Sequence, residues 1–115
     1  MSRQWREYRT AGGSRPVKEF LNRELSPSEV ADVLAAMSEV KRDGLLAARH
    51  LRGDIYEVRV GSSTRSFRVL FAAEGRYGQV FLSLSVFAKK TQRTPKREIK
   101  LAETRLMDWR RRGGK

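Results

Sequence analysis

Three runs of alternating apolar and polar residues constrain the fold of this chain more than any other feature. They cover residues 54–60, 65–72 and 79–87, and breaks that contain glycine or serine separate them. Successive side chains of a β-strand point to opposite faces of its sheet, so a period of two predicts three strands. The connections between the runs are short, which makes the strands antiparallel.

The alternation also predicts what each face of the sheet carries. Glu57, Arg59 and Arg68 fall on one face, so charged side chains project from the middle of the sheet. The opposite face is expected to be apolar and to need a cover. Its members are Tyr56, Val58 and Val60 of the first run, Phe67, Val69 and Phe71 of the second, and Val80, Leu82, Leu84 and Val86 of the third.

Helical spacing predicts two helices before the sheet. Residues 14–25 form the first, with Ser14 as its N-terminal cap. The second begins at a capping box made by Ser26 and Glu29 and ends at Gly44. Its apolar stripe, which is expected to cover the sheet, consists of Val30, Val33, Leu34, Met37 and Val40.

The fold class that follows is a single α+β domain over residues 1–115. It has an antiparallel sheet of three to four strands, with residues 4–9 as the candidate fourth strand, and two N-terminal helices packed on one face. Residues 45–51 connect the second helix to the sheet. A basic loop at residues 89–94 leads into a C-terminal basic helix, and residues 110–115 are expected to be a flexible tail.

The balance of charge narrows the range of partners. The chain has 25 Lys and Arg residues against 13 Asp and Glu, a net charge of +12. Such a charge attracts polyanions, so nucleic acid, an acidic protein or both are expected, and a basic surface that only aids solubility is the alternative. With no cysteine and one histidine, no disulfide, thiol nucleophile, metal site or other cofactor is expected. No apolar run approaches the roughly 20 residues that span a bilayer, which predicts a cytoplasmic protein without a membrane anchor.

Motifs in the sheet region resemble a known family. The segments LRGDIYEVRV, FRVLFA and VFLSLSVFAKKTQRTPKREIKLAETR follow one another in order. In this they resemble the phage-derived, HigB-like branch of the RelE/HigB type II toxins, within the ParE/RelE superfamily. The resemblance covers residues 20–105.

This resemblance implies an activity and partners. Members of the family are ribosome-dependent mRNA endoribonucleases that inhibit translation as the toxins of toxin–antitoxin systems. The resemblance therefore implies a RelE-like domain that enters the ribosomal A site and cleaves messenger RNA to leave a 2′,3′-cyclic phosphate and a 5′-hydroxyl. It also implies a helix-turn-helix, HigA-like antitoxin as partner, and no small-molecule cofactor.

The residues of this sequence allow that chemistry. The 2′-hydroxyl of RNA can attack the adjacent phosphate without a metal if one group removes its proton and cations stabilise the phosphorane. Arg68 and Arg59 are predicted to bind the scissile phosphate, and Glu57 to orient them. Lys89 and Lys90 are predicted to stabilise charge and to assist proton transfer, because nearby cations lower the pKa of a lysine.

Further residues are predicted to contact RNA, with Phe87 stacking on a base: Phe87, Tyr56, Arg93, Lys96 and Arg97. Structural alternatives stay open. Arg68 could pair with Glu57 or Asp54 of the neighbouring strand, the two lysines could be solvated, and Phe87 and Tyr56 could belong to the core. His50 is set aside as a general base, because it precedes the sheet and has no second histidine to act with.

Two other functions remain open. One is a non-catalytic basic module of the same fold, a phage accessory protein that binds RNA, DNA or the ribosome. The other is a DNA-packaging or structural phage protein, which would bind duplex DNA with a steep salt dependence. The placement of four cations distinguishes an enzyme from a binding module: Arg59, Arg68, Lys89 and Lys90. An enzyme needs them in one cleft, whereas a binding module can scatter them over a convex surface.

Overall fold

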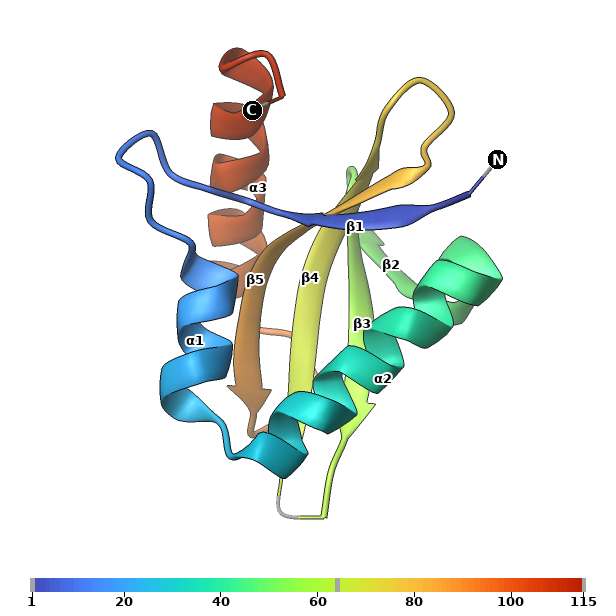
Figure 1. Ribbon diagram of the computed structural model, residues 1–115, viewed down its shortest axis with the longest axis vertical. Coiled ribbons are helices and arrows are strands. Elements are labelled where there is room, and N and C mark those ends of the chain that lie inside the picture. Colours follow the sequence, from blue (N-terminus) through green and yellow to red (C-terminus); the bar gives the residue numbers. More distant parts are fainter. Residues whose placement is uncertain (1, 64, 115) are drawn as a thin grey trace.

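A five-stranded mixed sheet forms the centre of the molecule, and helices cover both of its faces (Figure 1). The computed structural model describes residues 2–63 and 65–114. The α+β class predicted from the sequence is confirmed. Across the sheet the strands lie in the order β1 (Gln4–Glu7), β5 (Val80–Lys89), β4 (Ser66–Glu74), β3 (Ile55–Gly61) and β2 (Arg49–Arg52).

The sheet is larger than the predicted three to four strands and is not wholly antiparallel. The three alternating runs are confirmed as β3, β4 and β5, and the candidate strand at residues 4–9 is confirmed as β1. The sequence predicts a connection for most of residues 49–52, but these residues form the strand β2. A turn at Gly53, with φ of 54°, folds them back onto β3. β1 runs parallel to β5, since helices and three strands separate the two in the chain and no hairpin sets their relative direction.

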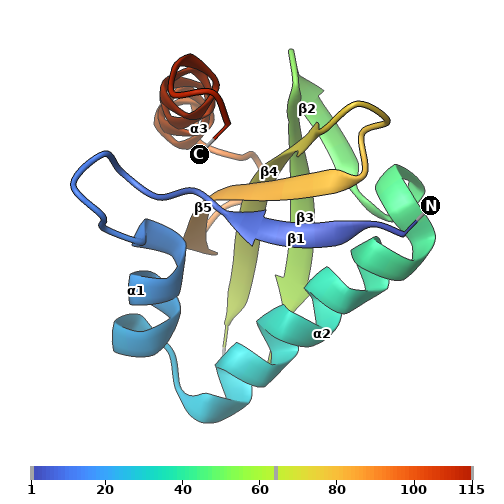
Figure 2. The same ribbon diagram turned by 45° about the horizontal axis from the view of Figure 1, so that its top comes forward.

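Helices lie on both sides of the sheet (Figure 2). The helices α1 (Pro16–Glu24) and α2 (Pro27–Asp43) lie on one side, and a short 3₁₀ helix, η1 (Gly44–Ala47), follows α2. On the opposite side, α3 (Lys96–Arg111) packs an apolar stripe against the sheet. The stripe consists of Ile99, Ala102, Leu106 and Trp109. The predicted C-terminal basic helix is therefore also a core element. Its exposed cations are Lys96, Arg97, Lys100, Arg110 and Arg111, whereas Arg105 is half-buried and donates to the Leu84 carbonyl of β5.

The ends of the first two helices follow local sequence signals to different degrees. The capping box of α2 is present, because the Ser26 hydroxyl accepts from the Glu29 amide and the Glu29 carboxylate accepts from the Ser26 amide. Gly44 ends α2 with φ of 82°. The prediction of Ser14 as the cap of α1 is wrong. The cap is Arg15, whose amide donates to the Glu19 carboxylate at 2.8 Å.

A β-bulge divides the apolar residues of β5 between the two faces. Leu70 lies opposite Ser85 and Phe71 lies opposite Ser83, so Leu84 is an extra residue in β5. Leu82 and Leu84 consequently join the core under α3, whereas Val86 joins the core under α1 and α2. The shared face predicted for the apolar residues of the third run, Val80 to Val86, is therefore wrong.

The C-terminal segment is more ordered than predicted. α3 continues to Arg111, and the Arg110 guanidinium pairs with Glu74 at 2.8 Å and with Asp54 at 3.0 Å. Arg112 pairs with Asp108 at 2.8 Å. The prediction of a flexible tail from residue 110 is thus wrong for its first three residues, and Lys115 lies outside the described residues. Among the helices described, none is both long and apolar enough to cross a membrane.

Candidate active site

The strand register brings charged residues together on the α3 side of the sheet. Arg59 of β3 lies opposite Arg68 of β4, and Arg68 lies opposite Phe87 of β5. Next to this row, Lys89 lies opposite Ser66. Residues that face each other across neighbouring strands point to the same side, so these cations share one face.

Glu57 is the carboxylate at the centre of this group. Its side chain has no exposed surface. Arg59 Nε donates to Glu57 Oε1 at 3.1 Å, Arg68 Nε lies 3.5 Å from the same oxygen, and the Thr94 hydroxyl donates to Glu57 Oε2. A buried charge is stable only when it is paired and hydrogen-bonded. Glu57 therefore has the contacts needed to orient two arginines and to attach the loop after β5 to the sheet.

Arg68 is the most deeply buried cation of the group. Its side chain is 6% exposed, and it lines a cavity of about 380 Å³ with Lys89 and Lys90. Arg68 Nε is buried without a hydrogen bond among the described residues, because its approach to Glu57 is an ion-pair distance without hydrogen-bond geometry. Burial lowers the pKa of Arg68, and Arg59 and Arg49 lower it further, while Glu57 raises it. An arginine remains protonated even so, and a buried donor that lacks an acceptor favours the binding of an anion.

Lys89 contributes a group that can exchange a proton. Desolvation lowers its pKa, the neighbouring cations Arg68 and Arg59 lower it further, and Glu57 raises it. Its ammonium group also donates to the Gln92 carbonyl, which shapes the loop after β5. The cavity therefore combines fixed positive charge with an amine whose proton is held less tightly than usual.

A second basic cavity adjoins the first. Its volume is about 450 Å³, and Gln92 lines both cavities. The cationic side chains that line it are Arg49, Arg52, Arg59, Arg93 and Lys96. We refer to the two cavities with Glu57 as the basic site. Its size and charge match a length of phosphodiester backbone rather than a single small anion.

The basic site includes most of the residues predicted from the sequence but not all of them. Tyr56 lies on the opposite face, where it packs against the core under α1 and α2 and its ring centroid lies 5.8 Å from that of Phe71. Phe87 lies in the core under α3 and is 9% exposed, so it is not free to stack on a base. Arg97 is exposed on α3 but lines neither cavity. For Tyr56 and Phe87 the core alternative is the one that the structure supports.

The sequence does not single out several residues of the site, among them Arg49, Arg52 and Thr94. Arg49 lies directly opposite Glu57 on β2, a segment for which the sequence predicts a connection and not a strand. The two-residue turn of Gly53 and Asp54 ahead of β3 is the available signal for a hairpin. Thr94 falls in the predicted basic loop, and nothing local in the sequence indicates that its hydroxyl reaches Glu57, 37 positions away.

The single histidine lies apart from the basic site. His50 Nε2 contacts the Gly53 carbonyl at 2.8 Å, and its ring centroid lies 5.0 Å from that of Tyr56, on the other face of the sheet. Among the described residues, no group of three or more His, Asp or Glu side chains is placed to hold a metal ion. The chemistry that the site itself offers comes from cations, the buried carboxylate of Glu57 and the hydroxyl groups of Ser66, Thr91 and Thr94.

Replacement of Thr94 by valine is expected to destabilise the fold by about 1–3 kcal/mol, because a buried acceptor oxygen of Glu57 then lacks its donor. Urea unfolding followed by circular dichroism measures the change. Thr104→Val, at an exposed position of α3, is the matched control and should change stability by less than about 0.5 kcal/mol. Equal stabilities for the two variants would contradict the assigned role of the hydroxyl.

Fold and site together define a small, basic α+β domain with a buried carboxylate amid its cations. Residues 19–107 match the family described as Phage derived protein Gp49-like (DUF891). The chain is also 36% identical over 112 residues to a protein named Probable endoribonuclease HigB1 in two strains of Mycobacterium tuberculosis, CDC 1551 / Oshkosh and ATCC 25618 / H37Rv. Each alignment covers 93% of this chain and 85% of the relative. The chain belongs to the phage-derived Gp49-like family, and the HigB-like affiliation predicted from its motifs is confirmed.

Proposed function

We propose that this protein is the toxin of a type II toxin–antitoxin system and that it inhibits translation as a ribosome-dependent mRNA endoribonuclease. The observation that carries the proposal is the convergence of Arg68, Lys89 and Lys90 on one cavity, with Arg59 in the adjoining one. The similarity to a relative named as a probable endoribonuclease supports the same activity. A convergent arrangement favours an enzyme over a module that binds nucleic acid on a convex surface.

In this proposal the chain's own residues carry out a metal-free transesterification. Arg68 and Arg59 bind the non-bridging oxygens of the scissile phosphate, and Glu57 holds both guanidinium groups in position. The neutral amine of Lys89 takes the proton of the 2′-hydroxyl as that oxygen attacks phosphorus. As the bond from phosphorus to the 5′-oxygen breaks, the ammonium group of Lys90 donates a proton to that oxygen. The products are a 2′,3′-cyclic phosphate and a 5′-hydroxyl.

The second basic cavity gives this site a way to hold a message. Arg93 and Lys96 line it from the loop after β5 and the start of α3, where they can contact phosphates that flank the scissile one. We further propose that cleavage takes place in the ribosomal A site and that a helix-turn-helix antitoxin neutralises the protein. Both follow from the family resemblance and both can be tested directly.

The deciding experiment compares messenger RNA on programmed ribosomes with free RNA. Purified protein is incubated with each, beside the variant Arg68→Ala/Lys89→Ala, and the 5′ and 3′ ends of every fragment are mapped. The expected result is a set of defined A-site cuts with 5′-hydroxyl ends, present only with ribosomes and wild-type protein. Intact RNA in all lanes, together with tight and salt-sensitive RNA binding, would instead establish a non-catalytic basic module on the same fold.

The pH dependence of cleavage tests the role of Lys89. An amine accepts a proton only in its neutral form, so the single-turnover rate should rise with pH and level off at a lower pH than the ordinary pKa of lysine would give, because that pKa is lowered here. Arg59→Gln removes one of the cations that lower the pKa and should move the profile to higher pH.

The exposed residue Arg97 provides the matched control for this measurement. Arg97→Gln should leave the pH profile in place, since this side chain lines neither cavity. Lys89→Arg retains the charge but cannot lose its proton near neutrality, so its remaining activity should not rise with pH in this way. A profile that is the same in wild type and Lys89→Arg would exclude Lys89 as the base.

A further inference from the structure

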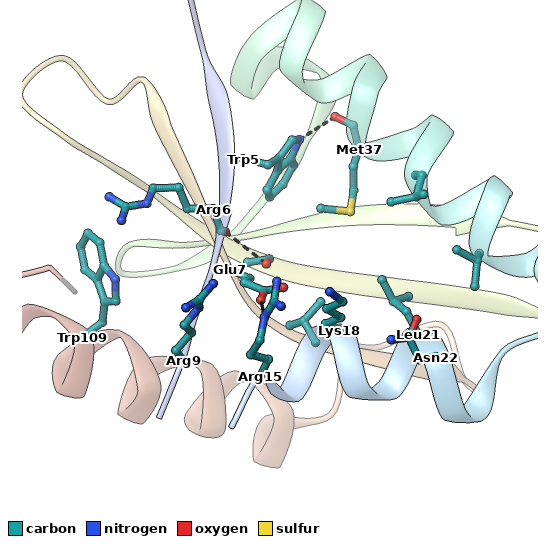
Figure 3. A pocket seen from close by; sticks show the side chains of 14 residues that line it. Trp5, Arg6, Glu7, Arg9, Arg15, Lys18, Leu21, Asn22, Met37 and Trp109 are labelled. Carbon is teal, nitrogen blue, oxygen red and sulfur yellow. Dashed lines mark hydrogen bonds and ion pairs between the residues drawn. The ribbon is translucent and has the colours of Figure 1, made fainter. Parts of the chain in front are cut away.

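A groove of about 790 Å³ runs along α1, α2 and the edge strand β1 (Figure 3). It shares no lining residue with the two cavities of the basic site. Nothing in the chemistry proposed above uses it. The groove is thus a separate feature, larger than either cavity of the basic site.

The walls of the groove are apolar. Leu21 projects from α1, and Met37 projects toward it from α2 (Figure 3). Val30 and Leu34 continue the α2 wall, and Leu34 is 50% exposed. The apolar stripe of α2 was predicted to cover the sheet, but only part of it does so, since Val33 and Val40 are buried while Leu34 faces the groove. An exposed apolar strip of this kind is typical of a contact surface.

Several contacts hold the groove in shape. Trp5 Nε1 donates to the Met37 carbonyl at 2.8 Å and so attaches β1 to α2. The Trp5 ring packs edge-on against Phe71, with the ring centroids 5.0 Å apart. The Arg15 guanidinium pairs with Glu7 and attaches the start of α1 to β1. A preformed groove loses little entropy when a partner binds.

The rim of the groove is positively charged. Arg6 and Arg9 of the β1 segment and Lys18 of α1 line it, and all three side chains are exposed. None of the three takes part in an ion pair with another described residue. The one acidic residue that lines the groove, Glu7, is already paired with Arg15. The surface therefore combines an apolar floor with unpaired positive charge.

We propose that this groove is the docking site for an acidic, amphipathic helix of a partner protein. Apolar side chains of such a helix at positions i, i+3, i+4 and i+7 would pack between α1 and α2, and its carboxylates would face Arg6, Arg9 and Lys18. The apolar walls suit a protein better than a nucleic acid, whose binding surfaces are mainly cationic and stacking. Addition of a strand to β1 is disfavoured, since this edge strand is four residues long and carries Arg6.

The groove lies apart from the cavities of the basic site, which affects how a partner bound there could regulate the protein. A helix bound there leaves Arg68 and Lys89 open, so it does not compete directly with RNA at the basic site. Identification of the partner as the antitoxin rests on the proposed function. The preference of the groove for an acidic helix is independent of the proposed function. It can be tested on the isolated protein without any assay of cleavage.

A peptide selection tests the proposal. The full chain is the target for a displayed library of helical peptides with apolar residues at the i, i+3, i+4 and i+7 positions and random residues elsewhere. The selected peptides are expected to be rich in Asp and Glu on their polar face. Affinity of a selected peptide, measured by fluorescence anisotropy, should fall at least about tenfold with Leu34→Asp and with the pair Arg6→Glu/Lys18→Glu.

The chain offers a matched control for the apolar substitution. Leu46 is 98% exposed in η1 and does not line the groove, so Leu46→Asp should leave peptide affinity unchanged. The proposal is overturned if no peptide is enriched above a selection without target, if the selected peptides have no acidic bias, if Leu34→Asp binds as wild type, or if a short RNA displaces the peptide.

Discussion

Replacement of Arg68 by alanine is expected to lower the rate of RNA cleavage by at least about a hundredfold. Charge develops on the phosphate oxygens in the transition state, and removal of one preorganised donor from a buried site has effects of about this size. Arg68 is the most buried cation of the basic site, and its buried Nε lacks a hydrogen bond among the described residues. Arg68→Lys should recover only part of the rate, because lysine keeps the charge but not the planar fork of donors.

The measurement is a single-turnover cleavage assay on programmed ribosomes, with ribosome binding followed separately by sedimentation. Arg76→Ala is the matched control, since Arg76 is exposed in the turn between β4 and β5, where its guanidinium lies over Tyr77. That control should cleave like wild type. For Arg68→Ala, the affinity for the ribosome should change much less than the cleavage rate. The reason is that the contact between Arg68 and the phosphate is expected to strengthen in the transition state. A rate within about threefold of wild type would remove Arg68 from the mechanism.

Replacement of Glu57 by glutamine should reduce the free energy of unfolding by about 3–5 kcal/mol, because a buried ion pair then loses one partner. The Glu57 side chain is fully buried and the Arg68 side chain nearly so, which leaves Arg68 as an uncompensated buried cation in the variant. The Thr94 hydroxyl and Arg59 lose a charged acceptor at the same time. Urea unfolding gives the difference, and cleavage should fall with it.

Two further variants separate this effect from a general loss of charge. Glu57→Gln/Arg68→Met removes both members of the buried pair and should be more stable than Glu57→Gln alone. Glu103→Gln breaks the ion pair with Arg52, whose side chain is 49% exposed, and should cost no more than about 1 kcal/mol. A Glu57→Gln protein as stable as the Glu103→Gln protein would show that the buried carboxylate does not hold the site together.

Several features of this protein follow from local sequence alone. The alternation in residues 54–60 and 65–72 determines β3 and β4, and it also places Glu57, Arg59 and Arg68 on the same face. Ser26 and Glu29 determine where α2 begins, since a capping box is complete within four residues. In each case the residues that interact are neighbours in the chain or in adjacent strands, so their spacing in the sequence carries the information.

Other features were decided only when distant segments met. The parallel pairing of β1 with β5, the bulge at Leu84 and the packing of α3 on the sheet depend on contacts across much of the chain. These contacts bury Phe87 under α3 and place the Thr94 hydroxyl on the Glu57 carboxylate. The alternation of apolar and polar residues along a strand predicts which residues share a face, but it does not predict which element covers that face. Local sequence therefore determined the charged row of the site, and tertiary packing decided which of its neighbours could reach it.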